Sequence, residues 1–190
     1  MKYLFLLGLF LLTGFISSER VESIYLFWSP DVKLKWTDFH GHISPEDDIA
    51  ASASYIGFFH KVRKHPHPDS VMLDTRAFFN KSKSWVKVPA VNPSLLEHEQ
   101  RHFDLAELFA RKFRKASFEL KLRSQNLAKS IDSTYKYYSV RGDSIHIQYD
   151  IETNHGLSLI PQAKWNEKIK NGLLELSPYS NPVLKLFMAR

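Results

Sequence analysis

The sequence predicts a single α+β domain, with an N-terminal mixed or antiparallel β-sheet packed on one long helix and further helices toward the C-terminus. Strand-like runs separated by turn residues fill residues 24–88, and an unbroken helical periodicity follows Asn92. Hydrophobic residues make up 44% and charged residues 24% of the 190 residues. Because both fractions resemble ordinary globular proteins, at about 45–50% and 25%, intrinsic disorder of the whole chain is excluded.

The expected strands differ in pattern. Residues 32–36 alternate apolar and polar side chains, which is typical of a half-buried strand. Runs of small, aromatic and β-branched residues predict three more strands, at residues 50–59, 71–79 and 84–88. Proline and acidic residues predict loops at residues 44–48 and 61–69.

The long helix has a clear start. Asn92 is a favourable N-cap and Pro93 suits the first helical position. No Gly or Pro interrupts the chain until Gly142, so we expect a helix from about Pro93 to about Arg123. Further on, we expect a turn at residues 141–143, a helix or a strand at 145–154, and a closing helix at 161–176.

The N-terminus has the pattern of a secretory signal. Lys2 precedes an uncharged, mostly apolar run over residues 4–16, and the small residues Ser17 and Ser18 follow. We therefore expect residues 1–18 to be a signal peptide, residues 19–190 to form the domain, and the protein to be exported to the periplasm or beyond. No apolar run reaches the ~18–20 residues of a membrane-spanning helix, so no stable span is expected after signal removal.

Composition limits the chemistry. The chain has no Cys, which fits a bacterial exported protein better than a eukaryotic one and excludes a thiol nucleophile or a Cys-based metal site. Any metal must therefore bind His and carboxylate side chains. The net charge of +6 is mild and partly belongs to the basic end of the long helix, where it complements the helix dipole. A nucleic-acid partner is therefore not expected.

The long helix carries an H-E-x-x-H motif, formed by His98, Glu99 and His102. The two histidines are about 40° apart on one helix face and one turn apart along the axis, so both imidazoles can reach one zinc ion. Glu99 lies about 100° from His98, beside that ion, where it can take a proton from a zinc-activated water. The motif predicts a zinc site.

The third zinc ligand must come from outside this motif. Asp104 and Glu107 point about 240° and 180° from His98, so we expect them to form surface ion pairs or to bond a neighbouring segment. Residues 149–156 contain three potential ligands and a glycine that permits a close backbone approach. The wider set of candidates is His40, His42, His60, His65, His67, His146, Asp150, Glu152 and His155.

Several segments together resemble a known family. They are residues 34–41, 84–86, 95–107 and 149–156, followed by Gln162 and Trp165. In this order they resemble the bacterial predicted secreted zinc-dependent proteases, grouped as domain of unknown function 922. The resemblance covers about residues 33–170. It implies a single domain with a zincin-like fold and zinc-dependent protease activity.

These observations predict an exported zinc metallopeptidase that acts on a protein or peptide substrate as a monomer. His98 and His102 bind Zn²⁺, with His155 as the first choice for the third ligand and Asp150 as the alternative. Water fills the fourth position, and Glu99 acts as its general base. Tyr149 is the candidate for stabilising the oxyanion, although a buried aromatic role is the alternative for it.

Two other functions use the same residues. A zinc amidase acting on cell-wall peptides would need an identical catalytic set, so the sequence does not separate it from a peptidase. A non-catalytic secreted zinc-binding module would instead have a closed site with four protein ligands. The number of protein ligands therefore distinguishes catalytic from structural zinc.

Overall fold

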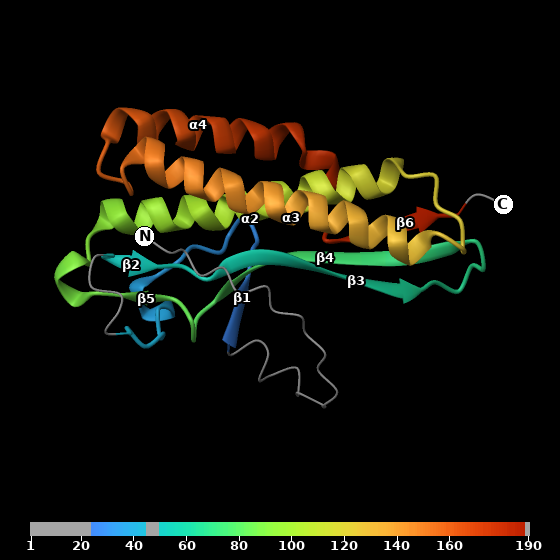
Figure 1. The fold of residues 1–190 in the computed structure, drawn as a ribbon, viewed down its shortest axis with the longest axis horizontal. Coiled ribbons are helices and arrows are strands. Elements are labelled where there is room, and N and C mark those ends of the chain that lie inside the picture. Colours follow the sequence, from blue (N-terminus) through green and yellow to red (C-terminus); the bar gives the residue numbers. More distant parts are fainter. Residues whose placement is uncertain (1–23, 45–49, 189–190) are drawn as a thin grey trace.

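The computed structural model describes residues 24–44 and 50–188, and in it the helices stack over one face of an antiparallel sheet (Figure 1). The strands are β1 Tyr25–Phe27, β2 Ser52–Ala53, β3 Ile56–Lys64, β4 Ser70–Asn80, β5 Trp85–Val86 and β6 Val183–Phe187. The helices are α2 Pro93–Glu119, α3 Leu127–Thr153 and α4 Leu159–Glu175, with short 3-10 helices at Trp36–Asp38, Val88–Ala90 and Ser177–Tyr179. The α+β class is confirmed.

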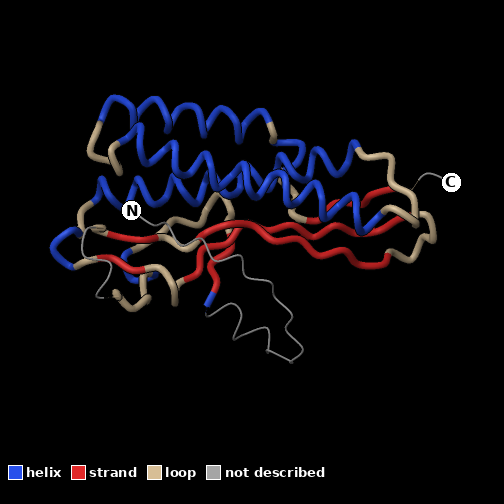
Figure 2. The backbone as a smooth tube through the Cα atoms, viewed as in Figure 1, coloured by secondary structure: helices blue, strands red, loops and turns tan. Residues whose placement is uncertain are grey.

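Strand β4 is the centre of the main sheet. It pairs along its length with β3, and its other edge pairs with β1 near one end and with β6 near the other, all antiparallel. A separate two-stranded pair joins β2 to β5, with Ser52 opposite Val86. Figure 2 shows this small pair at the end of the molecule where α2 begins. The pair therefore lies close to the part of α2 that carries the two motif histidines.

The core forms between the main sheet and α2. Helix α2 contacts both β3 and β4, while α3 and α4 pack against α2. Leu73 and Phe79 of β4 are fully buried, as are Phe103 and Phe113 of α2. Burial of such side chains stabilises the fold by about 1.5–3 kcal/mol each. The apolar stripe of α2 therefore faces the sheet, and its two motif histidines face the other helices.

Helix α2 begins as predicted. The Asn92 side chain accepts a hydrogen bond from the backbone N–H of Leu95 at 2.9 Å, and Pro93 occupies the first turn. The helix ends at Glu119 rather than at Arg123, because Leu120 adopts an extended conformation. The closing helix is also confirmed, as α4.

Other predictions were wrong. Residues 32–36 form no strand, because buried Leu34 satisfies its N–H with the Gln100 side chain at 2.8 Å instead of with a neighbouring strand. Residues 141–143 lie inside α3 and form no turn, since Gly142 allows α3 to approach the Phe109 ring closely. For residues 145–154, by contrast, the helix alternative is confirmed, because these residues form the end of that same helix.

The remaining strand predictions hold in part. The run at 50–59 is divided between β2 and β3, and β3 continues to Lys64 into the predicted loop. Strands β1 and β6 were not predicted. The predicted signal peptide lies outside the described residues, as does most of the predicted loop at 44–48. Among the helices of the described ranges, none has the length and apolar character needed to cross a membrane.

Candidate metal centre

Three potential ligand atoms from two helices meet at one point. His98 and His102 lie one turn apart on α2, and Asp150 reaches them from α3. Asp150 Oδ1 lies 3.1 Å from His98 Nε2 and 2.8 Å from His102 Nε2, and the two Nε2 atoms are 3.2 Å apart. Tetrahedral ligands at 2.0–2.1 Å from one zinc ion lie about 3.3 Å apart. The three atoms therefore fit a zinc ion, and they are the one such group found among residues 24–44 and 50–188.

Asp150, the alternative third ligand, belongs to this group, and His155 does not. The Nδ1 atom of His155 lies 3.8 Å from Asp150 Oδ1, and its side chain is 59% exposed. The reason is the length of α3, which remains helical through Thr153 and directs Asp150 toward α2. Asn154 and His155 then adopt left-handed conformations, with φ of 49° and 53°, and the His155 side chain remains largely in solvent.

Gly156 allows the turn after α3 to pass directly against His98. Its φ is 82°, and a Cβ atom placed there would lie 2.9 Å from His98 Cβ and 3.0 Å from His98 Cγ. Only glycine combines this φ with such a close approach at no steric cost. The close backbone approach expected from the sequence is therefore present, and it is directed at a motif histidine.

Glu99 is buried beside the histidines and is held by two serine hydroxyls. Ser52 Oγ donates to Oε1 at 2.6 Å, and Ser54 Oγ donates to Oε2 at 2.5 Å. The two serines are two residues apart in an extended segment, so their side chains point the same way. Ser52 of β2 and Ser54 directly after it thereby fix the Glu99 carboxylate. Sequence reasoning did not identify these serines. The alternation of Ala and Ser over residues 51–54 was the signal that two hydroxyls lie on one face of an extended segment.

Tyr149 lies beneath the histidines in the core. Its ring stacks on the His98 ring at 4.6 Å between centroids and meets the His102 ring edge-on at 4.8 Å. Its hydroxyl donates to the backbone carbonyl of His98 at 3.3 Å and accepts from Gln162 Nε2 at 2.7 Å. Tyr149 has no exposed surface, and burial raises the pKa of its hydroxyl. These contacts favour the buried aromatic role over the oxyanion role.

The second nitrogen of each motif histidine also has a partner. His98 Nδ1 lies 3.1 Å from Gln162 Oε1, and His102 Nδ1 lies 2.9 Å from His146 Nδ1. Burial and the neighbouring His102 lower the pKa of His146 to about 3, so His146 is neutral. Both motif histidines thus have Nδ1 engaged by a neighbouring side chain and Nε2 facing Asp150. Such partners orient the imidazole ligands of metal sites.

The ionisation of the cluster suits a cation. Burial acts to raise the pKa of Asp150, but hydrogen bonds from His102 and His98 outweigh it and hold this pKa well below its usual range. Asp150 is therefore a carboxylate at neutral pH. Burial lowers the pKa of His102, whereas Asp150 and Glu99 raise it, and the net result is a pKa above the ordinary value. The site thus has a negative field that favours a positive charge.

Asp104 and Glu107 point away from the metal cluster, as the helical geometry predicted, and both form ion pairs: Asp104 with the partly exposed Arg101 at 2.7 Å, and Glu107 with buried arginines. Asp104 is buried and accepts a hydrogen bond from Trp28 Nε1 at 2.9 Å. Glu107 is buried against Arg114 at 2.8 Å and Arg111 at 2.9 Å. Asp104 therefore attaches Trp28 to α2. Glu107 instead pairs with two arginines of α2 itself, which in turn donate to the backbone carbonyls of Leu173 and Asn181.

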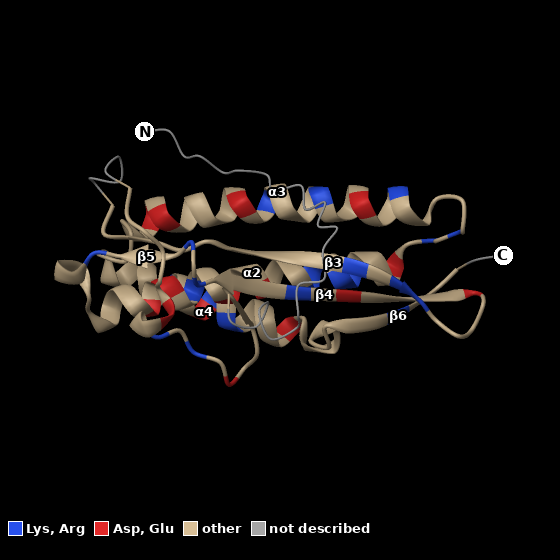
Figure 3. Cartoon of the chain, turned by 90° about the horizontal axis from the view of Figure 1, so that it is seen from below, with Lys and Arg blue, Asp and Glu red and all other residues tan. Residues whose placement is uncertain are grey.

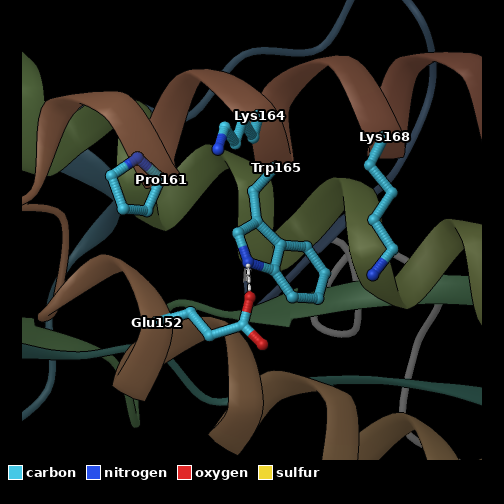
Figure 4. Close-up of a pocket in the computed structure, with 5 residues that line it drawn as sticks. All are labelled: Glu152, Pro161, Lys164, Trp165 and Lys168. Carbon is cyan, nitrogen blue, oxygen red and sulfur yellow. Dashed lines mark hydrogen bonds between the residues drawn. The ribbon is translucent and has the colours of Figure 1, made fainter.

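The other candidate ligands lie outside the cluster. Glu152 accepts a hydrogen bond from Trp165 Nε1 at 2.7 Å and lines a surface pocket between α3 and α4 (Figure 4). His60 bonds Asp132 at 3.2 Å, and His40 Nε2 lies 2.6 Å from the Thr37 carbonyl. His42, His65 and His67 are also absent from the metal group.

The family model described as "Bacterial protein of unknown function (DUF922)" matches residues 80–156. This match includes the motif on α2, Asp150 on α3 and the turn that ends at Gly156. No curated protein and no solved structure shows a significant match to the chain. The comparison therefore supports the family resemblance and leaves the activity open.

Proposed function

We propose that the protein is a zinc-dependent hydrolase of peptide bonds. The observation that carries this proposal is the group of three potential protein ligands with a buried carboxylate, Glu99, directly after the first of them. A catalytic zinc has three protein ligands and an open position, whereas a structural zinc has four. Within the described parts of the chain, the group has three members. This number favours the hydrolase over the non-catalytic zinc-binding module.

Each residue has a distinct role in the proposed reaction. His98, His102 and Asp150 hold the metal, and a zinc ion bound there would polarise a substrate carbonyl and lower the pKa of a water molecule. Glu99 accepts a proton from the attacking water and passes it to the leaving amine. Ser52 and Ser54 hold both oxygens of Glu99, which keeps the base in one orientation.

The oxyanion requires a donor other than Tyr149, because that hydroxyl is buried and already bonded. The exposed side chain of His155 lies beside Asp150, with its Nδ1 atom 3.8 Å from Asp150 Oδ1. An imidazole N–H in this position can donate a hydrogen bond to the developing negative charge. We therefore assign this role to His155 within the proposal.

The substrate class is a peptide, and a zinc amidase acting on cell-wall peptides remains the second candidate because it needs the same residues. We propose export of a monomer to the periplasm or beyond. We propose no nucleic-acid partner, because basic and acidic residues are mixed along α3 rather than forming a basic face (Figure 3). Intact-mass measurement on protein from the native host tests export: cleavage near Ser18 is expected, and retained Met1 would contradict it.

The activity is tested with zinc-loaded protein, a labelled protein substrate and isolated cell-wall peptides. The Glu99→Gln variant should bind zinc as before and lose hydrolysis by about 10²–10⁴-fold, because an amide cannot accept the proton. Glu119→Gln is the matched control, since Glu119 is exposed at the far end of α2. Undiminished turnover in Glu99→Gln would remove Glu99 from the base role.

A further inference from the structure

Gln162 on α4 connects His98 to the rest of the helical layer. Its Oε1 lies 3.1 Å from His98 Nδ1, and its Nε2 donates to Tyr149 Oη at 2.7 Å and to Asn166 Oδ1 at 2.8 Å. The side chain is buried, so water does not compete for these bonds. Gln162 thus uses its acceptor and both of its donor hydrogens.

The orientation of the Gln162 amide follows from its neighbour Asn166, which contacts the Arg101 guanidinium, a group that donates hydrogen bonds and accepts none. Arg101 Nε donates to the side chain of Asn166 at 3.1 Å, and a guanidinium has no acceptor atom. The atom of Asn166 that Arg101 contacts must therefore be Oδ1. Since Gln162 contacts this same Oδ1, it must present its NH₂ group there. Its Oε1 is then left facing His98.

Two further contacts agree with this orientation. Asn166 Nδ2 donates to Glu97 Oε1 at 2.9 Å, which independently places the nitrogen of Asn166 on the side away from Gln162. Tyr149 accepts from Gln162 and donates its own hydrogen to the His98 backbone carbonyl. Each hydrogen in this chain has one acceptor. The network therefore admits a single arrangement of amide groups, which ends with an oxygen facing His98 Nδ1.

We propose that Gln162 is a positioning residue that keeps hydrogen on His98 Nδ1, so that Nε2 is the nitrogen left to bind a metal beside His102 and Asp150. The inference rests on the proposed metal site and deepens it. Free neutral histidine favours hydrogen on Nε2, where it would block metal binding. Partners of ligating histidines fix the tautomer and ring orientation in this way. Helix α4 thus contributes to the site although it supplies none of the three proposed ligands.

Two substitutions separate this role from simple packing. Gln162→Leu keeps a similar volume and removes the acceptor, and it should weaken zinc affinity by about 10–100-fold. Gln162→Glu keeps an acceptor oxygen facing His98 but places its other oxygen against Asn166 Oδ1, so it should lose less than about 10-fold in zinc affinity. Gln148→Leu is the control, because Gln148 is exposed on α3 and its side chain donates to Glu152 Oε1 at 2.6 Å.

Zinc affinity is measured by competition with a chelating dye, and thermal melting shows whether each variant is folded. The tautomer of His98 is read from ¹⁵N NMR of the metal-free protein, which requires no activity. The wild type and Gln162→Glu should carry hydrogen on Nδ1, whereas Gln162→Leu should shift toward Nε2. A structural role alone would lower the melting temperature without this shift.

Unchanged zinc affinity and an unchanged tautomer in Gln162→Leu would overturn the proposal. If this variant does not fold, Gln162→Glu decides: loss of the Nδ1–H tautomer in it would overturn the proposal, and retention would support it. If the wild type binds no zinc, the proposed function fails. The tautomer result in the metal-free protein still decides the role of Gln162.

Discussion

Replacing Gly156 with alanine tests how the turn after α3 is packed against the metal cluster. The φ of Gly156 is 82°, and an added Cβ would lie 2.9 Å from His98 Cβ, 3.0 Å from Cγ and 3.3 Å from Nδ1. The neighbour is the rigid base of a buried imidazole, which the Tyr149 ring holds from one side. Relief of the clash therefore requires His98 or the backbone of the turn to move.

The cost has two parts. A left-handed conformation costs a residue with a Cβ about 1–2 kcal/mol. Overpacking a buried site costs about 1–3 kcal/mol more. Gly156→Ala should therefore lower the free energy of unfolding by about 2–5 kcal/mol. At roughly 2–4 °C per kcal/mol for a chain of this size, the melting temperature should fall by about 4–20 °C.

Thermal melting followed by circular dichroism measures this loss. Gly57→Ala is the matched control, because a Cβ there would meet only the Phe78 ring at an ordinary 3.6 Å. The control should change the free energy of unfolding by less than about 1 kcal/mol. The displaced imidazole of His98 should also weaken zinc binding in Gly156→Ala alone. Equal melting temperatures for Gly156→Ala and the wild type would refute the described packing.

Three further predictions concern other parts of the molecule. Glu107→Ala should lower the free energy of unfolding by about 3–5 kcal/mol in a denaturant titration, because it leaves Arg111 and Arg114 buried without their carboxylate; a loss below about 1 kcal/mol would contradict the buried pair. Burial lowers the pKa of His60 below 6.5, although Asp132 acts to raise it. Below pH 6.5 the unfolded chain therefore takes up a proton at His60 more readily than the native protein does. The wild type should accordingly lose stability as the pH falls through this range. His60→Gln should lose less over the same range, and parallel pH slopes of the melting temperature would count against this assignment. His98→Ala should lose zinc as well as hydrolysis, unlike Glu99→Gln, and metal analysis of the two purified variants distinguishes them.

Local signals in the sequence predicted the motif helix well. The Asn92 cap, the following proline and the apolar spacing all act within a few residues, and the histidine spacing follows directly from helical geometry. For the same reason, the directions of Asp104 and Glu107 away from the metal could be predicted. Their burial could not, because it depends on Trp28 and on Arg114, which come from another segment and from two turns along the helix.

The choice between His155 and Asp150 depended on where α3 ends. Gly142 reads as a helix breaker, yet it lies within α3 because Phe109 occupies the space that a side chain would need. With the helix running to Thr153, Asp150 faces α2 and His155 lies beyond the cap. This outcome is set by packing between helices, which local patterns do not contain. The roles of Ser52 and Gln162 depend on such distant contacts too.

The most direct test of the proposed site is the zinc affinity of Asp150→Ala beside that of His155→Ala, measured by chelator competition at neutral pH. Asp150→Ala removes a proposed ligand and should weaken zinc binding by more than the ~10–100-fold expected for a residue that only orients a ligand. His155→Ala should retain zinc affinity close to that of the wild type, because its ring lies outside the three-atom group. Retained zinc binding in Asp150→Ala, with loss in His155→Ala, would contradict the site described here.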